Sequence, residues 1–318
     1  GNIWEAPLHY VTCNVCAHVY KNPNIDANDM KELYKNCVIE HSTEHNSIRA
    51  KMHFESFNKL MNHYFNKIID PISVLEIGCV NGALLKQIYN NHQNEISFVK
   101  GIEPSIELGK LFKGNDNFIF ENIFFDEFDF SEKYDLIILD NVFEHFDFPI
   151  LELKKIKKII TEGGFLYISI PNILIPITGF VDIFAGHPSN YVIENFTFLM
   201  DKAGYFVEKV DYNYKWLNCI VRPKRIGDVL PDFNFPQIKK KLIKDMQIHL
   251  DRNNILQNKL KSIVKQEVDY LISKEKKLLI YGAGCHTQEL LSHINFSNSI
   301  IGLIDSNPFY HGKKRLGF

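Results

Sequence analysis

The stretch from residue 71 to residue 170 constrains the fold most, because short apolar runs alternate there with longer segments of helical periodicity. Strands separated by helices indicate a mostly parallel sheet with helices on both faces. The run "DLIILD" is apolar between its two aspartates, which is typical of a central strand that is buried on both sides. The chain is therefore predicted to be an α/β protein.

The first apolar run leads into a glycine loop and then a helix, in "SVLEIGCVNGALLKQI". Glycine permits a tight turn close to a ligand, and the start of the helix offers free N–H groups. The spacing Glu76-x-Gly78-x-x-x-Gly82 differs from the G-x-G-x-x-G of dinucleotide sites. The carboxylate of Glu76 would repel a pyrophosphate but would favour an ammonium or sulfonium group. The loop predicts an S-adenosylmethionine site, with an ordinary strand-to-helix turn as the alternative.

Four segments, in order, resemble the motifs of class I S-adenosylmethionine-dependent methyltransferases. "VLEIGCVNG" resembles their first motif, and "VKGIEPS" resembles their second strand with its terminal acidic residue. "YDLIILDNVFEHFDFP" and "LKKIKKIITEGGFLYISIPN" resemble their fourth-strand and fifth-strand segments. The resemblance implies a Rossmann-like methyltransferase domain that uses S-adenosylmethionine.

The same resemblance implies which residues bind the cofactor. Glu103 would accept hydrogen bonds from both ribose hydroxyls, as a carboxylate is able to do. The third strand of the family ends near the adenine, where this sequence offers Asn122 or Ile123. The full predicted cofactor-binding set is Glu76, Gly78, Cys79, Gly82, Glu103, Pro104, Asn122, Asp140 and Asn141.

The catalytic residues are predicted from the segments after the fourth and fifth strands. Methyl transfer is an in-line displacement, so the protein aligns donor with acceptor and, where needed, removes a proton. "GHPSNYVIENF" resembles a family segment in which a histidine stands four residues before an aromatic residue, so His187 and Tyr191 are candidates. His145 is the rival base. In the sugar C-methyltransferase branch the histidine is the base, but Gly186 replaces the glutamate that usually precedes it. Both histidines have structural alternatives, in helix-start packing and in loop hydrogen bonding.

Residues 1–66 are predicted to form a helical lid segment that begins with a cysteine motif. "YVTCNVCAHVYKNP" resembles the second zinc knuckle of a subset of these methyltransferases. Only Cys13 and Cys16 have ligand spacing, and tetrahedral zinc needs four ligands. The cysteine motif therefore has two interpretations, a structural zinc site and a metal-free turn. The helices are expected to cover the site, where Tyr34, Tyr64 or nearby histidines could touch the substrate.

Composition shifts divide the rest of the chain. Residues 67–215 are predicted to form the methyltransferase domain, and residues 216–275 a linker with lysine-rich helices. Residues 276–318 resemble the C-terminal Rossmann-like domain of the sugar C-methyltransferase group and are interpreted as truncated. Gly282 fits a nucleotide loop there, but Thr287 stands where the third glycine would be.

Composition also argues against several partners. A formal net charge of −2 gives no electrostatic case for a nucleic acid. No apolar run reaches the roughly 18 residues of a membrane span, and no leader is evident, so a cytoplasmic location is expected. Six cysteines in 318 residues are too few for a disulfide scaffold. The oligomeric state is not predicted.

These observations predict methyl transfer from S-adenosylmethionine to a small polar acceptor. A sugar or nucleotide-linked sugar is the expected acceptor class, with C- and O-methylation both open. O- or N-methylation of another small metabolite is the alternative enzyme interpretation. A nicotinamide-dependent oxidoreductase that uses the Gly282 loop, and a binding module without turnover, are the competing classes.

Overall fold

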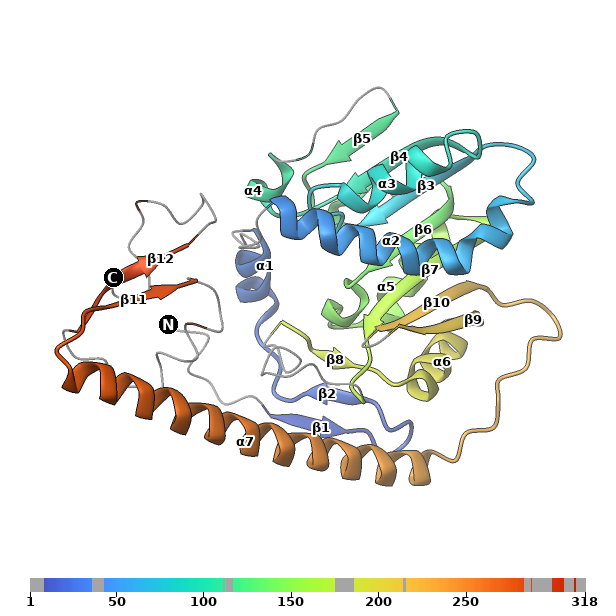
Figure 1. Cartoon of the computed structure of the whole chain (residues 1–318). Coiled ribbons are helices and arrows are strands. Elements are labelled where there is room, and N and C mark those ends of the chain that lie inside the picture. The colour runs from blue at the N-terminus through green and yellow to red at the C-terminus, as the bar shows by residue number, and fades with distance from the viewer. Residues whose placement is uncertain are drawn as a thin grey trace. The chain divides into compact units, whose positions relative to one another are not determined.

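The computed structural model has two compact units, each described by itself below (Figure 1). The first unit holds residues 1–39 and 47–246, and the second holds residues 40–46 and 247–318. The residues that the structure describes are 9–35, 43–110, 112, 117–174, 186–213, 216–282, 287, 299–305 and 312.

A seven-stranded sheet forms the centre of the first unit, in the order β5-β4-β3-β6-β7-β10-β9 (Figure 1). Neighbouring strands from β5 to β7 run parallel, and β10 runs antiparallel to both of its neighbours. The strands are β3 (Ile72–Ile77), β4 (Ile96–Ile102), β5 (Phe118–Glu121), β6 (Tyr134–Asp140), β7 (Ile160–Pro171), β9 (Tyr205–Asn213) and β10 (Trp216–Pro223). The predicted α/β class and its mostly parallel sheet are confirmed.

Helices cover both faces of this sheet (Figure 1). On one face α2 (Thr43–Phe65) and α3 (Ala83–Asn91) bury side chains such as Phe57 and Leu85. On the other face α5 (Pro149–Ile159) and α6 (Ile193–Lys202) bury Leu153 and Phe196. Apolar residues three and four positions apart make these helix faces, and their burial supplies most of the stability of such helices. The remaining short helices of this unit are α4 (Ile106–Gly109), η2 (Phe125–Glu127) and η3 (Phe143–His145).

The first unit also contains a small antiparallel sheet, which joins the N-terminal hairpin to a strand from late in the unit. It consists of β1 (Tyr10–Thr12), β2 (Val19–Lys21) and β8 (Ser189–Asn190), and α1 (Ala27–Lys35) follows β2. The hairpin closes through Cys13, whose N–H donates to the His18 carbonyl at 2.8 Å. Because β8 pairs with β2, the segment directly after His187 is attached to this hairpin.

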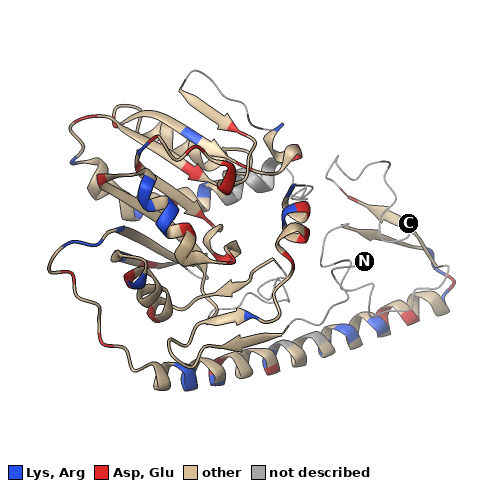
Figure 2. Ribbon diagram, turned by 180° about the vertical axis from the view of Figure 1, so that it is seen from behind, with Lys and Arg blue, Asp and Glu red and all other residues tan. Residues whose placement is uncertain are grey.

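Residues 216–223, which the sequence pattern assigns to the linker, form β10 inside the sheet. Leu217, Cys219 and Val221 join the core on one face, and Ile220 joins the core on the other. Proline and glycine recur only from the end of this strand onward, in "RPKRIGDVLPDFNFP". The lysine-rich stretch beyond them is a single helix, α7 (Phe235–Ser273), and Figure 2 shows charges of both signs along it.

The described part of the second unit contains a parallel pair, β11 (Leu278–Tyr281) and β12 (Ile300–Ile304). The Gly282 N–H donates to the Ile304 carbonyl at 2.7 Å, and the Thr287 hydroxyl donates to the Gly282 carbonyl at 2.7 Å. Much of the loop between these strands lies outside the described residues, and its nucleotide binding stays a prediction. Among the helices described in either unit, none is long and apolar enough to cross a bilayer.

Candidate active site at the carboxyl edge of the sheet

The glycine loop connects β3 to α3 and lies against the end of β4. The N–H groups of Gly78 and Cys79 both donate to the Ile102 carbonyl, at 2.8 and 3.0 Å. Gly78 and Gly82 have φ values of 71° and 70°, in the left-handed region. A Cβ atom on Gly78 would lie 2.5 Å from Val142 Cγ2, so both the backbone conformation and the surrounding space require glycine.

Replacing Gly78 by alanine should lower the free energy of unfolding by roughly 1 to 3 kcal/mol, because the left-handed backbone is strained for any other residue. The contact with Val142 adds to this cost. Urea unfolding would measure the change. Gly163→Ala is a matched control, since no atom lies within 4 Å of its Cβ position. An equal loss of stability in both variants would contradict the conclusion that Gly78 specifically requires glycine.

Glu103, directly after β4, has a carboxylate held by two backbone groups. Its Oε2 accepts from Val80 N–H at 3.0 Å, and its Oε1 accepts from Ser105 N–H at 2.9 Å. Burial raises the pKa of Glu103 to about 7, although both hydrogen bonds oppose this change. Val80 itself has a φ of 55°, an uncommon conformation for a β-branched residue. The loop is therefore built so that its backbone orients this carboxylate.

Glu76 is a second buried carboxylate, only 3% exposed, near the end of β3. Its Oε2 has no hydrogen-bond partner among the described residues. Burial raises the pKa of Glu76 well above its usual value, and the negative charges of Asp140 and Glu103 raise it further. A buried carboxylate is costly unless a cation or hydrogen-bond donors satisfy it. This edge of the sheet therefore favours a ligand that carries positive charge and several donors.

The other predicted cofactor residues surround the same loop. Asn122 donates from Nδ2 to the carbonyls of Glu103 and Ser105, at 2.6 and 3.1 Å, so this amide ties the backbone around the carboxylate. The neighbouring Ile123 packs against the core. Asn141 has a φ of 54°, and its Oδ1 accepts from Trp216 Nε1 at 2.8 Å.

Cys79 and Pro104 complete the predicted set. Cys79 is buried, which raises the pKa of its thiol, and Pro104 follows Glu103 with its side chain half-buried. The roles of all nine residues toward a cofactor stay predictions.

His53 of α2 is a site residue that the sequence pattern did not single out from the other histidines. Its Nδ1 lies 2.7 Å from Asp140 Oδ1, and its ring packs edge-on against Trp216 at a centroid distance of 4.7 Å. A carboxylate oxygen at this distance can accept a hydrogen bond from Nδ1, and in that tautomer of the neutral ring the lone pair is on Nε2. Nε2 is buried and has no hydrogen-bond partner among the described residues. The sequence signal is the position of His53 on the helix face that also carries Phe57 and Leu60.

Glu144, His145 and His187 form a second cluster of polar side chains beyond β6. One possible ligand atom of each lies within 4.8 Å of the others, and His187 Nε2 is 4.0 Å from Glu144 Oε1. Tyr34 of α1 joins them, since its hydroxyl lies 2.7 Å from His145 Nδ1. Tyr64, in contrast, donates to Glu208 of β9 and lies outside this cluster.

Of the two predicted catalytic residues, His187 lies in this cluster and Tyr191 lies in the hydrophobic core. The pKa of His187 is lowered to about 3, mainly by burial and also by the charges of His145 and Lys21. Tyr191 is fully buried, where its ring packs against Phe143 and His18, and burial raises its pKa. A catalytic role for either residue stays a prediction.

The cysteine pair lies in the turn of the β1–β2 hairpin. The Val15 N–H points to Cys13 Sγ at 3.4 Å, and Ala17 has a φ of 57°. Within the described part of the chain, Cys13 and Cys16 have no third side chain that completes a metal-binding group. The structure lends no support to the zinc prediction.

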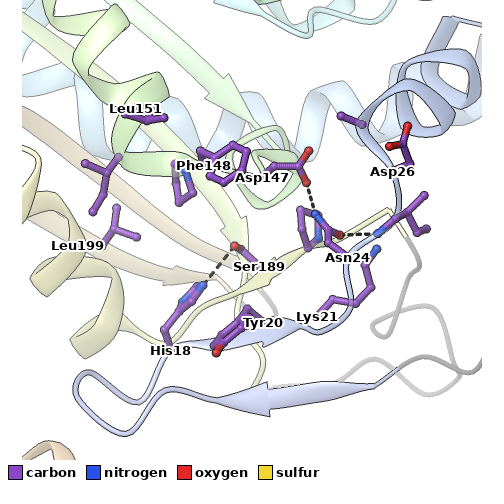
Figure 3. Close-up of a pocket in the computed structure, with 15 residues that line it drawn as sticks. His18, Tyr20, Lys21, Asn24, Asp26, Asp147, Phe148, Leu151, Ser189 and Leu199 are labelled. Atoms are coloured by element: carbon purple, nitrogen blue, oxygen red, sulfur yellow. Dashed lines mark hydrogen bonds between the residues drawn. The ribbon is translucent and has the colours of Figure 1, made fainter.

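A cavity of about 640 Å³ is lined by residues of β2, α5 and β8 and by Asp147 and Pro188, which are close in sequence to His145 and His187, although neither histidine lines it (Figure 3). Ser189 on its wall accepts or donates a hydrogen bond with His18 at 3.2 Å, and Asn24 hydrogen-bonds to Asp147. Tyr20, Phe148, Leu151 and Leu199 add apolar surface, and Lys21, Asp26 and Asp147 add charge. A volume of this size suits a small organic molecule.

The methyltransferase domain family matches residues 15–210 of the chain. The chain belongs to this family. Among curated proteins it is 27% identical over 172 residues to the tRNA U34 carboxymethyltransferase of Campylobacter curvus, which covers 51% of each chain. It is 28% identical over 109 residues to the mitochondrial ubiquinone biosynthesis O-methyltransferase of Candida albicans, which covers 32% of this chain and 33% of that one. The matched part therefore spans about half of the first relative and about a third of the second.

Among solved structures, magnesium protoporphyrin IX methyltransferase from Synechocystis PCC 6803, with bound S-adenosylhomocysteine, is 11% identical with a TM-score of 0.47. The match covers 63% of this chain and all of that one. The methyltransferase prediction is thus confirmed at the level of the family, whereas the sugar C-methyltransferase subgroup stays a prediction.

Proposed function

We propose that this methyltransferase transfers the methyl group of S-adenosylmethionine to a small polar acceptor. The observation that supports this most directly is the set of three carboxylates, Glu76, Glu103 and Asp140, at the ends of neighbouring parallel strands. The cofactor carries a sulfonium, an ammonium and two ribose hydroxyls. These groups would supply positive charge to all three carboxylates and a donor to Glu76 Oε2, which has no hydrogen-bond partner among the described residues.

The reaction needs alignment and one proton acceptor. An electron pair of the acceptor atom forms a bond to the methyl carbon, while the carbon–sulfur bond breaks and leaves its pair on S-adenosylhomocysteine. The proton of the acceptor must pass to a base. His53 is the base that we propose, because Asp140 fixes its tautomer and leaves Nε2 as a buried acceptor. His187, with His145 and Tyr191 nearby, is the second candidate.

The cavity lined by β2, α5 and β8 is where we place the body of the acceptor (Figure 3). Its wall combines aromatic surface with hydrogen-bonding side chains, as a hydroxylated molecule requires. Lys21 is offset by Asp26 and Asp147, which favours an acceptor of low net charge over a polyanion such as RNA. A sugar is the acceptor class that we propose on these grounds; a nucleotide-linked sugar would have to keep its anionic diphosphate outside this cavity.

The acceptor proposal is tested by incubating the protein with methyl-labelled cofactor and a panel of acceptors. The panel contains sugars, nucleotide-linked sugars, phenols and tRNA, and mass spectrometry detects the products. Labelled sugar products are expected, and loss of deuterium from a carbon next to a ketone would identify C-methylation. Transfer to tRNA alone would contradict the acceptor class. Cofactor binding without any transfer would instead support a binding module.

The affinity for S-adenosylmethionine should increase with pH up to about 7. Free Glu103 keeps its proton below its pKa of about 7, and a cationic ligand must displace that proton. Glu76 acts in the same direction, because burial raises its pKa also. Glu103 alone should make the association constant rise by up to tenfold per pH unit below about pH 7, and a proton lost from Glu76 would make the rise steeper. Calorimetry in buffers of different ionisation enthalpy would measure the released proton. An affinity independent of pH would contradict the prediction.

A further inference from the structure

We propose that Glu144, His145 and His187 bind one divalent transition-metal cation. Two imidazoles and one carboxylate are a ligand set that zinc, iron, cobalt and manganese accept. Binding of the cation is inferred from these three side chains and does not depend on the proposed function. Only its role in catalysis rests on the proposed function.

The positions of the three side chains suit a metal that draws them slightly together. Their possible ligand atoms all lie within 4.8 Å of one another, and His187 Nε2 lies 4.0 Å from Glu144 Oε1. Ligands at bond lengths of about 2.0 to 2.2 Å are separated by roughly 3 to 3.5 Å. The ligand atoms must therefore approach one another by roughly 1 to 1.5 Å for all three to bind one ion.

Neighbouring groups already orient His145 for this role. The Gly186 carbonyl lies 2.8 Å from His145 Nδ1, and a carbonyl oxygen can only accept. His145 Nδ1 therefore donates to this carbonyl, so in a neutral ring Nε2 is the nitrogen that we propose as the metal ligand. Tyr34 donates to the same carbonyl at 3.0 Å and contacts the same ring nitrogen. Contacts of this kind, in which a histidine donates its other N–H to a carbonyl, are the usual support of a metal ligand.

The charges around the cluster are mixed, and their balance favours a cation. Glu144 is buried with a side chain only 2% exposed, so its carboxyl group has little water around it. The His187 side chain is 13% exposed, so it is shielded from water in a similar way. The Lys21 ammonium acts against a cation, but Asp147 partly offsets its charge.

A cation at this site would keep coordination positions open, since the protein supplies only three ligands. A hydroxyl oxygen of the acceptor could occupy one of them, where the metal would lower the pKa of that hydroxyl. The hydroxyl proton would leave to His53, and the resulting oxyanion would attack the methyl carbon. In this arrangement His145 and His187 are ligands, and the base is the His53–Asp140 pair.

The test uses metal-free full-length chain, titrated with Co²⁺ in the absence of cofactor and acceptor. We expect one equivalent to bind with a visible spectrum typical of nitrogen and oxygen ligands, without the near-ultraviolet charge-transfer band of cobalt thiolates. Glu144→Gln and His187→Gln should each weaken binding at least tenfold. His92→Gln is the matched control, because that buried histidine hydrogen-bonds to Asn58 outside the cluster. Its cobalt affinity should equal that of the wild type.

Two further measurements separate this site from the cysteine pair and from unfolding. The double variant Cys13→Ser, Cys16→Ser should still bind one equivalent of Co²⁺ with the same spectrum. Proton NMR of the cobalt-loaded wild type should show two shifted, exchangeable imidazole N–H signals, so the test holds even where a variant does not fold. Absence of cobalt binding, or binding that follows the cysteines alone, would overturn the proposal. Because no cofactor is present, a failure to bind S-adenosylmethionine would not affect this result.

Discussion

Replacing Glu103 by alanine should weaken S-adenosylmethionine binding by about 2 to 3 kcal/mol, which corresponds to roughly a 30- to 150-fold higher Kd. The substitution removes a carboxylate that the N–H groups of Val80 and Ser105 already orient. Two charge-assisted hydrogen bonds to the ribose hydroxyls would be lost, whereas the loop keeps its other backbone hydrogen bonds. Isothermal titration calorimetry would measure the affinity.

The neighbouring Glu107 is a matched control for Glu103. It lies in α4, is exposed, and pairs with Lys110 at 2.6 Å. Glu107→Ala should therefore leave the affinity unchanged, which separates the effect of position from that of net charge. An unchanged Kd for Glu103→Ala, in a protein that unfolds at the wild-type temperature, would rule out the ribose assignment.

His53→Gln should lower kcat at least 100-fold and leave the Kd of S-adenosylmethionine close to its wild-type value. A positioned general base contributes about 10² to 10⁴ in rate, and glutamine keeps a polar group against Asp140 but has no basic nitrogen. Single-turnover methyl transfer with the acceptor found by the product screen would measure the chemical step. Calorimetry of the same protein would measure cofactor affinity.

Three variants distinguish the possible roles of His53. Asp140→Asn should also slow the reaction, because asparagine can hold the imidazole in the wrong tautomer. His92→Gln should have wild-type rates, since His92 packs against Phe65 away from the site. If His187→Gln abolished turnover in metal-free protein while His53→Gln did not, His187 would be the base. Equal loss of cofactor affinity and rate in His53→Gln would indicate a role in binding.

Much of the arrangement around the glycine loop was predictable because its determinants are local. Glycines at strand ends mark tight turns, and parallel strands end at one edge of a sheet, so Glu76, Gly78 and Glu103 were expected to lie together. The residues next to Asn122 in the sequence could not reveal that its Nδ2 donates to backbone carbonyls. Those contacts depend on how the loop after β5 packs against the loop after β4. β10 was also assigned to the wrong segment, since its antiparallel insertion beside β7 is decided by the sheet.

The acceptor side depended on contacts between residues that are far apart in the chain. His53 meets Asp140 across 87 positions, and Tyr34 meets His145 across 111. His53 reaches Asp140 from α2, and Tyr34 reaches His145 from α1, so each contact depends on how a helix of the N-terminal segment packs. By itself the sequence determined the order of strands and helices and the loop with its two glutamates, since periodicity and turn chemistry are encoded locally. Only the tertiary structure decided which histidines are buried, which carboxylates they face and where the cavity lies.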